Sequence, residues 1–246
     1  ISVTDSTTSN SVTNHSGRDK TVLVNLFQDK LDDMLEGYSR GMNDLLYGDG
    51  TADANALAGI RSIIVDDPSA TGTTVGGLST VTNTWWRNRA NVAISTTATG
   101  QELIETLHSE MRQLKRFGGK PDIAVCGSLF LDRLADELRR NGNYSNTGFS
   151  GNQNIAVGEI NYNGLKFVYD PALDDLTISG QNPDKRCYII DSSKLCMYYM
   201  DGEKMKRHSP ARPATQYVMF RAITTTASLA AFQLNCHGVY LSLIHI

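Results

Sequence analysis

The stretch that decides the fold is residues 19–50, which read DKTVLVNLFQDKLDDMLEGYSRGMNDLLYGDG. Its apolar side chains recur at every third or fourth position, namely Leu23, Phe27, Leu31, Met34, Tyr38, Met42 and Leu45. This spacing is typical of one face of an α-helix. Ser16 and Asp19 offer an N-terminal cap, and Gly48 and Gly50 end the pattern. A helix of about 28 residues is a rod of roughly 40 Å, so we expect a spine on which other elements pack.

Shorter helical patterns follow the spine. Residues 56–60 are compatible with one helical turn. A second helix is expected to begin near Thr99, where Glu102 completes a capping box. Its predicted buried stripe is Leu103, Leu107, Met111 and Leu114. A third helix is expected from Ser128, and its predicted inward side chains are Leu131, Leu134, Ala135 and Leu138.

Strand patterns dominate the second half of the chain. Asn163-Gly164 is a strong hairpin-turn signal between expected strands at 155–160 and 165–169. Further strands are expected at 62–65, 121–126, 187–190, 195–200, 217–224 and 229–239. The Asn-, Gly- and Ser-rich residues 141–154 indicate an exposed loop. Because helices largely precede strands instead of alternating with them, we predict the α+β class.

Composition excludes several classes of protein. The chain has 246 residues, of which 40% are apolar and 20% charged, and this balance excludes a wholly disordered chain. The net charge of −3 lacks the basic excess of a dedicated nucleic-acid binder. No apolar run approaches the roughly 20 residues that span a bilayer, so we expect no integral membrane protein. No secretory signal opens the sequence, and the first residue is Ile1 instead of Met.

Charge is unevenly distributed along the chain. Residues 1–110 hold 7 basic and 14 acidic side chains, whereas residues 181–246 hold 8 basic and 4 acidic ones. An acidic region and a basic region of this kind attract one another within a chain or between chains. The paired tryptophans after a polar loop suggest one ring in the core and one at a neighbour. The resulting subunit-interface candidates are Asp29, Asp32, Asp33, Glu36, Trp85, Trp86, Arg87, Lys204, Lys206, Arg207 and Arg212.

Motifs that carry catalytic or ligand-binding chemistry were not found. Gly118-Gly119-Lys120-Pro121 ends a helix, whereas a phosphate loop begins one. The five histidines have no zinc-protease spacing, and adjacent acidic pairs such as Asp66-Asp67 suit turns or solvated faces. The four cysteines form no Cys-x-x-Cys pair and are expected to be reduced and buried. We therefore predict no enzyme, no cofactor and no metal site.

The order and spacing of several short stretches resemble one family, the tailed-phage major capsid proteins with the Hong Kong 97-type fold. The stretches are Leu46-Tyr-Gly-Asp-Gly50, Leu57-Ala-Gly-Ile60, Val75-Gly-Gly77, Thr84-Trp-Trp-Arg-Asn88, Lys120-Pro-Asp-Ile-Ala-Val125, Gly164-Leu-Lys-Phe-Val-Tyr-Asp-Pro171 and Tyr188-Ile-Ile-Asp-Ser-Ser-Lys194. The resemblance covers about residues 10–240. It implies a long spine helix in a peripheral domain, an axial domain near the capsomer centre and an extended loop reaching over a neighbour.

On this template the chain divides into four parts. Residues 1–18, which hold only three aliphatic side chains, correspond to a partial extended loop or arm, and a frayed terminus is the alternative. Residues 19–120 correspond to the spine, loop and second helix of the peripheral domain. Residues 121–185 are mainly the axial domain, and 186–246 return to the peripheral domain. The extended loop's outgoing strand has no counterpart, so we expect a chain truncated at its start.

The resemblance implies a virion protein that is assembled in the host cytoplasm. Its partners would be further copies of itself in hexamers and pentamers, together with portal, scaffold or maturation protease and packaged double-stranded DNA. A weak net charge suits a shell wall that holds DNA without binding it tightly. The alternatives are a nanocompartment shell of the encapsulin kind, a small-ligand-binding α+β module and an enzyme of unknown class.

The last six residues, Leu241-Ser-Leu-Ile-His-Ile246, are the translation of a common transposon-adapter sequence. We therefore expect residues 241–246 to be an artefact joined to a truncated reading frame. A genuine terminal strand is the alternative.

Overall fold

The structure is a computed structural model. It describes residues 17–51, 53–95, 102–140, 159–162, 164–178, 182–208 and 222–243, with side chains from residue 29 onward except those of 139, 140, 159 and 243. The chain divides into two compact units. The first comprises Ile1–Asn43 and Tyr198–Ser228, and the second comprises Asp44–Met197 and Leu229–Ile246. The loop predicted at 141–154 lies outside the described residues.

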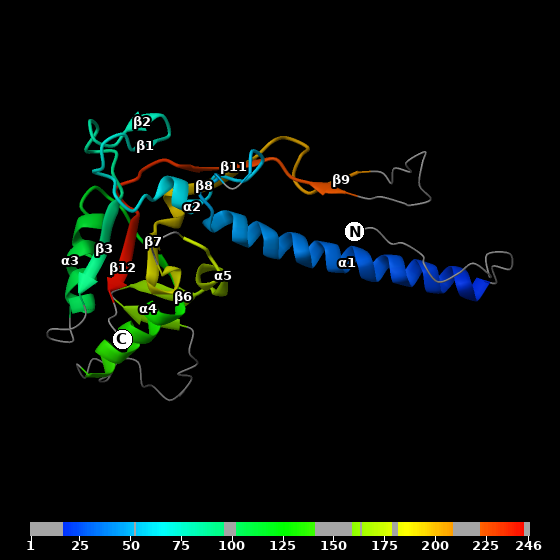
Figure 1. The fold of residues 1–246 in the computed structure, drawn as a ribbon, viewed down its shortest axis with the longest axis horizontal. Helices are drawn as coiled ribbons and strands as arrows, with labels where there is room; N and C mark the ends of the chain where they lie inside the picture. The colour runs from blue at the N-terminus through cyan, green and yellow to red at the C-terminus, as the bar shows by residue number, and fades with distance from the viewer. Residues whose placement is uncertain are drawn as a thin grey trace. The chain divides into compact units, whose positions relative to one another are not determined.

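The second unit is built on a six-stranded sheet (Figure 1). Its strands in spatial order are β3 (Arg89–Ser95), β12 (Gly238–Leu243), β7 (Arg186–Ile190), β4 (Ile123–Cys126), β6 (Leu165–Tyr169) and β5 (Glu159–Tyr162). β12 is parallel to β3 and β4 is parallel to β6, whereas the other neighbours are antiparallel. The predicted combination of helices and sheet is confirmed.

The alternation of side chains along the sheet generates two apolar cores. On β7, Cys187 and Ile189 belong to one core, whereas Tyr188 and Ile190 belong to the other. Successive residues of a strand point to opposite faces, so one apolar strand supplies both cores. A sheet that is buried in this way requires a covering layer on each face.

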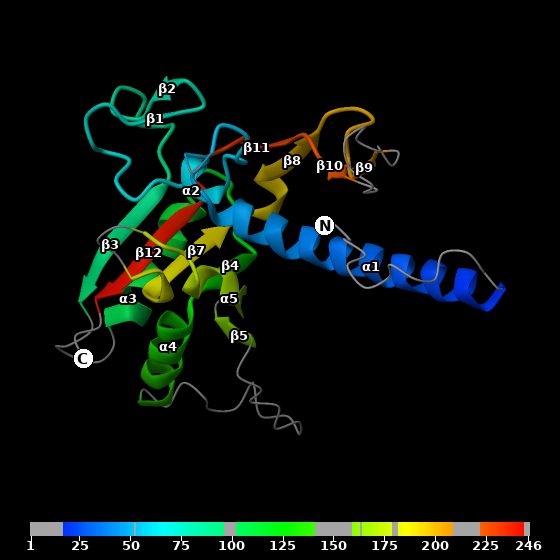
Figure 2. The ribbon, with the colours of Figure 1, turned by 45° about the vertical axis from the view of Figure 1, so that its right-hand side comes forward.

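Two helices form the layer on the first face (Figure 2). They are α3 (Glu102–Leu114) and α4 (Ser128–Arg140). The four predicted α3 side chains are buried, as are three of the four predicted on α4, while Ala135 is half-buried. The Glu137 carboxylate of α4 accepts hydrogen bonds from the Leu103 and Ile104 backbone N–H groups at the start of α3. The predicted cap residue Thr99 lies outside the described residues.

The layer on the second face consists of short elements and connections. It contains the end of α1 at Tyr47, α2 (Ile60–Ile63), the β1 (Thr74–Val75) and β2 (Leu78–Ser79) hairpin and α5 (Pro171–Asp174). The strand predicted at 62–65 is wrong. Ile60, Ile63 and Ile64 are buried at helical spacing on a single turn, and a short apolar run does not distinguish such a turn from a strand.

The first unit contains most of the spine. α1 (Gly17–Tyr47) confirms the predicted long helix and its end before Gly48. The other elements at or beside this unit are β8 (Leu195–Tyr199), β9 (Lys206–Arg207), β10 (Ile223–Thr224) and β11 (Ala227–Ala231), with β8 paired to β11 and β9 to β10. The Tyr38 hydroxyl lies 2.5 Å from the Thr225 hydroxyl, and Thr225 also accepts a hydrogen bond from the Met205 N–H. This bond joins α1 to the β9–β10 ribbon.

Most of the other strand predictions hold, and one more is wrong. The predictions at 121–126, 187–190 and 195–200 correspond to β4, β7 and β8, and the predicted hairpin corresponds to β5 and β6. Of residues 217–224 the structure describes only the end, as β10. The strand predicted at 229–239 is two strands separated by a turn, because β11 ends at Ala231 and β12 begins at Gly238. In the turn, the His237 N–H bonds the Leu234 carbonyl.

The ends of the chain and the remaining short elements complete the description. Two 3₁₀ turns, η1 (Pro183–Lys185) and η2 (Ser192–Lys194), precede β7 and β8. Leu241 and Ser242 are buried in β12, so the segment suspected to be an artefact begins inside the sheet. That prediction remains untested. The two compact units do not follow the boundaries expected at 120 and 185. The six-stranded sheet takes strands from all three expected segments, 19–120, 121–185 and 186–246. The division into axial and peripheral domains stays a prediction.

We predict that Gly59→Ala destabilises the fold. A Cβ atom at Gly59 would lie 2.2 Å from the Leu46 carbonyl oxygen and 2.7 Å from that of Leu45, and neither backbone atom can rotate away. Overpacking of this kind costs roughly 1–3 kcal/mol of unfolding free energy. Chemical denaturation followed by circular dichroism measures the change.

The matched control is Gly41→Ala, because a Cβ atom at this exposed position of α1 meets nothing within 4 Å. Alanine is the better helix former, so this control should be neutral or stabilising by up to about 1 kcal/mol. Equal stability of the two variants would contradict the packing argument.

Candidate interface surfaces and buried ionisable groups

The predicted acidic residues lie on one exposed part of α1. We call this set the acidic stripe, and its members are Asp29, Asp32, Asp33 and Glu36. Two members have basic partners on the same helix: Lys30 lies 3.4 Å from Asp33, and Arg40 lies 2.5 Å from Glu36. All these side chains are exposed, so each pair contributes only about 0–1 kcal/mol to stability. The stripe therefore retains net negative charge at the surface.

The predicted basic stretch, Lys204, Lys206, Arg207 and Arg212, lies at and beyond β9. Two of its charges already have partners within the ribbon. The Lys204 ammonium lies 4.8 Å from the centre of the Tyr199 ring, and Lys206 forms an ion pair with Glu203. Arg212 lies outside the described residues. No contact between this stretch and the acidic stripe is found among the described side chains, so their pairing remains a prediction.

The first unit has no buried core in its described part. None of the side chains of 29–43, 198–208 and 222–228 is buried, and none belongs to either apolar core. Tyr198 is 53% exposed and Met200 is 64% exposed. The described part of this unit therefore exposes large apolar side chains at and just after the end of β8.

Trp85 and Trp86 have different environments, as predicted for the pair. Trp86 packs against the second apolar core and its indole N–H donates to the Val75 carbonyl at 3.0 Å. Trp85 meets it edge to face, with ring centres 5.8 Å apart, and is 63% exposed. The Arg87 guanidinium donates to the carbonyls of Thr80 and Val81, so it fastens its own loop. An interface role of these three residues stays a prediction.

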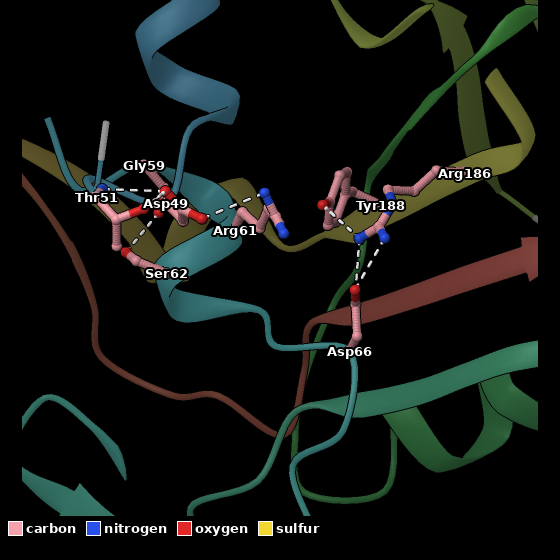
Figure 3. A network of polar contacts seen from close by, with 8 residues as sticks. All are labelled: Asp49, Thr51, Gly59, Arg61, Ser62, Asp66, Arg186 and Tyr188. Atoms are coloured by element: carbon pink, nitrogen blue, oxygen red, sulfur yellow. Dashed lines mark hydrogen bonds and ion pairs between the residues drawn. The ribbon is translucent and has the colours of Figure 1, made fainter. Parts of the chain in front are cut away.

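A buried ion pair links the 60–66 segment to the centre of the sheet (Figure 3). Arg186 on β7 is fully buried, and its two terminal nitrogens donate to the two Asp66 carboxylate oxygens at 2.5 and 2.9 Å. One of these nitrogens also bonds the Tyr188 hydroxyl at 3.0 Å. Sequence reasoning placed Asp66 in a solvated turn, and this is wrong for Asp66. It holds for Asp67, which accepts hydrogen bonds from Ser69.

A second polar group fixes the connection that follows α1 (Figure 3). The Asp49 carboxylate accepts hydrogen bonds from the backbone N–H and hydroxyl of Thr51, at 3.0 and 2.7 Å. Arg61 on α2 lies 3.3 Å from the same carboxylate. The Thr51 bonds are the main reason that the pKa of Asp49 lies below its usual value. Together with Arg186, these contacts position the connection on the second face of the sheet.

Another bidentate pair, Arg89 with Glu110, lies on the first face. Arg89 donates to the two Glu110 oxygens at 2.8 and 2.7 Å, and the buried Tyr240 hydroxyl donates to Glu110 at 3.2 Å. Burial is the main cause that raises the pKa of Tyr240 well above its usual value. No local sequence signal indicated this triad, because its members are contributed by β3, α3 and β12.

His237 is buried and held in its neutral form. Its Nδ1 accepts a hydrogen bond from the Asp191 N–H at 3.2 Å. Burial lowers its pKa to about 4, against the opposing influence of the Asp191 and Asp122 carboxylates. Cys236 beside it is a free thiol whose pKa burial raises to about 11. Cys236 and His237 are thus buried residues at the end of the turn between β11 and β12.

The described residues include neither a metal-ligand cluster nor a membrane-spanning helix. Among them, no group of three His, Cys, Asp or Glu side chains has the geometry to hold a metal ion. A search of the same residues finds no helix long and apolar enough to cross a bilayer. An open groove of about 330 Å³ lies beside β3 and the end of α3. Its lining includes Arg89 but not the more deeply buried Arg186 or His237.

We predict that Asp66→Asn destabilises the protein while Asp67→Asn has little effect. The first change leaves the buried Arg186 guanidinium without its carboxylate. Breaking a buried pair costs about 3–5 kcal/mol, and the partial exposure of Asp66 favours the lower end. Asp67 is exposed in the adjacent turn and provides the matched control. Urea unfolding measures both variants, and equal stabilities would contradict a structural role of the pair.

We also predict an acid-sensitive contribution from His237. The unfolded histidine titrates near 6.5 and the folded one at about 4, so the unfolded state binds more protons between these values. Stability from this group is complete above the unfolded pKa. It falls by on the order of 3 kcal/mol as the pH drops to the folded pKa. His237→Asn places an oxygen acceptor near Nδ1, so its unfolding free energy should depend less on pH in this window. Parallel curves for both proteins would contradict the assignment.

Comparisons with known proteins bear on the fold. No protein-family model matches the chain, and neither does any curated protein. The cyanophage A-1(L) capsid asymmetric unit is similar, with 18% identity and a TM-score of 0.59 over 87% of this chain and 69% of that chain. The capsid of Myoviridae phage XM1 matches at 13% identity and a TM-score of 0.45, over 89% of this chain and 66% of that chain. The chain therefore shares the fold of the cyanophage capsid protein.

Proposed function

We propose that this protein is a structural major capsid protein. It self-assembles into hexamers and pentamers of an icosahedral phage head that encloses double-stranded DNA. The observation that carries this proposal is the fold shared with the cyanophage A-1(L) capsid structure over most of the chain. At 18% identity the similarity concerns the fold, so assembly requires its own experiment.

The surface of the first unit supports this proposal. Between residues 29 and 46 no side chain of the 31-residue helix α1 is buried, and Tyr47 at its end belongs to the second apolar core, so this stretch does not obtain its stability from a local core. Tyr198 on β8 and Met200 just after it are also exposed. Contacts from further copies of the chain would cover these surfaces, which a self-sufficient monomer would leave in water.

The proposed roles of the parts follow the Hong Kong 97-type template. Residues 19–120 and 186–246 would belong to the peripheral domain, and residues 121–185 mainly to the axial domain. Residues 1–18 would belong to the extended loop. The proposed partners beyond other copies are a portal, a scaffold or maturation protease and the packaged DNA. The role is structural and not enzymatic, and the protein would reside in the virion after assembly in the host cytoplasm.

Expression of the complete reading frame tests the proposal. We expect negative-stain electron microscopy and light scattering to reveal shells or capsomer rings, because the surfaces described above would be covered only in an assembly. DNA recovered from particles in infected cells would support the packaging role. A protein that stays monomeric at high concentration, with and without a co-expressed scaffold, would overturn the capsid proposal.

A further inference from the structure

A dense group of positive charges lies at the end of α3. We call this group the α3 basic patch, and its members are Arg112, Lys115, Arg116 and Lys120. All four side chains are exposed, and none forms an ion pair with any described residue. The helix dipole favours cations in a last turn, but it does not require four of them within nine residues.

Carboxylates beside this patch already accept hydrogen bonds. Glu110 on α3 holds Arg89 through two of them, and Asp191 accepts one from the Lys120 backbone N–H. The Arg116 guanidinium lies 5.4 Å from the centre of the Phe117 ring, which is 63% exposed. The patch therefore combines uncompensated positive charge with an exposed aromatic surface.

The patch adjoins the open groove of about 330 Å³. Arg87, Arg89 and Arg116 line this groove together with Gln113 and Phe117. Three guanidinium groups, an amide and an aromatic ring suit a partner that presents carboxylates on an ordered protein surface. A nucleic acid backbone would use the charges but not the apolar part of the groove.

The acidic stripe of α1 has the complementary chemistry. Asp29 and Asp32 are exposed and have no ion-pair partner among the described side chains. The stripe extends over about 10 Å of helix axis between Asp29 and Glu36. Arg112 lies in the last turn of α3, and Lys115, Arg116 and Lys120 follow within the next six residues.

We propose that the α3 basic patch of one copy binds the acidic stripe of the next copy. This inference rests on the proposed self-assembly and names the surfaces that join neighbours. The two surfaces differ, so the contact is heterologous, and heterologous contacts generate rings when the rotation between copies closes. Each copy supplies one patch and one stripe, which is the requirement for closed hexamers and pentamers.

The patch is a better counterpart for the stripe than the basic stretch at β9. Lys206 is paired with Glu203, and Lys204 lies over the Tyr199 ring. Arg116 of the patch likewise lies over a ring, that of Phe117, but no member of the patch forms an ion pair with a described residue. Binding the stripe therefore requires no existing ion pair of the patch to break.

Two charge-reversed proteins test the contact. The patch variant carries Arg112→Glu, Lys115→Glu and Arg116→Glu, and the stripe variant carries Asp29→Lys and Asp32→Lys. Like charges then face each other between copies, so each variant alone should form at least about tenfold fewer rings than the wild type. Circular dichroism and thermal melting check the fold. If the patch variant fails to fold, the neutral variant Arg112→Gln, Lys115→Gln and Arg116→Gln should still weaken assembly.

Mixing the two variants separates contacts between copies from contacts within one copy. In a 1:1 mixture, patch and stripe are complementary only where the two variants alternate around a ring. Alternation closes only in rings with an even number of subunits, so hexamers should return and pentamers should not. A single chain with both reversals should restore both ring types. Rescue by the double reversal without rescue by mixing would indicate pairing within one chain and overturn the proposal.

Further outcomes separate the remaining possibilities. If the patch variant builds normal shells that retain less DNA, the patch binds nucleic acid and the proposal is wrong. If reversal of Lys204, Lys206 and Arg207 abolishes rings while the patch variant forms them normally, the stripe binds the β9 stretch and the proposal is wrong. Wild-type protein that forms no rings would instead overturn the proposed function. If the wild type and both variants assemble equally well, the proposed contact is wrong while the proposed function stands.

Discussion

All five side chains of β7 are buried, and the organisation of the sheet unit follows from this constraint. A strand without a solvent-facing side needs a covering layer on each face. Helices α3 and α4 provide one layer with a regular apolar stripe. Among the described residues, no comparable helix pair covers the second face, and the end of α1, short turns and a hairpin loop take its place. The helical layer on the first face and the layer of short elements on the second face thus both cover the apolar side chains of the same sheet.

The buried Arg186 makes the irregular layer specific. An unpaired guanidinium in the sheet would be costly, so the chain must bring a carboxylate to it. Asp66 meets this need from a position 120 residues earlier and thereby fixes where the connection after α2 crosses the sheet. The loop that continues from Asp66 contains the hairpin and ends at the exposed Trp85. The buried ion pair thus anchors the start of the loop that carries Trp85.

The sequence predicted those elements whose signal is local. The spine, the α3 stripe and the Asn163-Gly164 hairpin each depend on residues within a few turns of one another. The turn at 232–237 was missed because it depends on a distant contact. A Cβ atom on Gly119 would lie 2.6 Å from the Cys236 side chain, so this close approach cannot be recognised from a run of apolar residues. For the same reason Asp66 and Asp67 looked equivalent, although only one has a partner across the sheet.

The sequence could show which interface candidates are charged. It could not show which of these charges already have an ion-pair partner in the same chain. Lys206 and the α3 basic residues look alike in the sequence, but the first has Glu203 beside it and the others have no acidic partner among the described residues. A single exposed ion pair contributes little, because water and salt screen it. Several such pairs gathered at one heterologous contact act together, and ring closure adds one further contact without bringing in another subunit. Several weak ion pairs can therefore direct assembly together. The charges that take part are those without an ion-pair partner in the monomer.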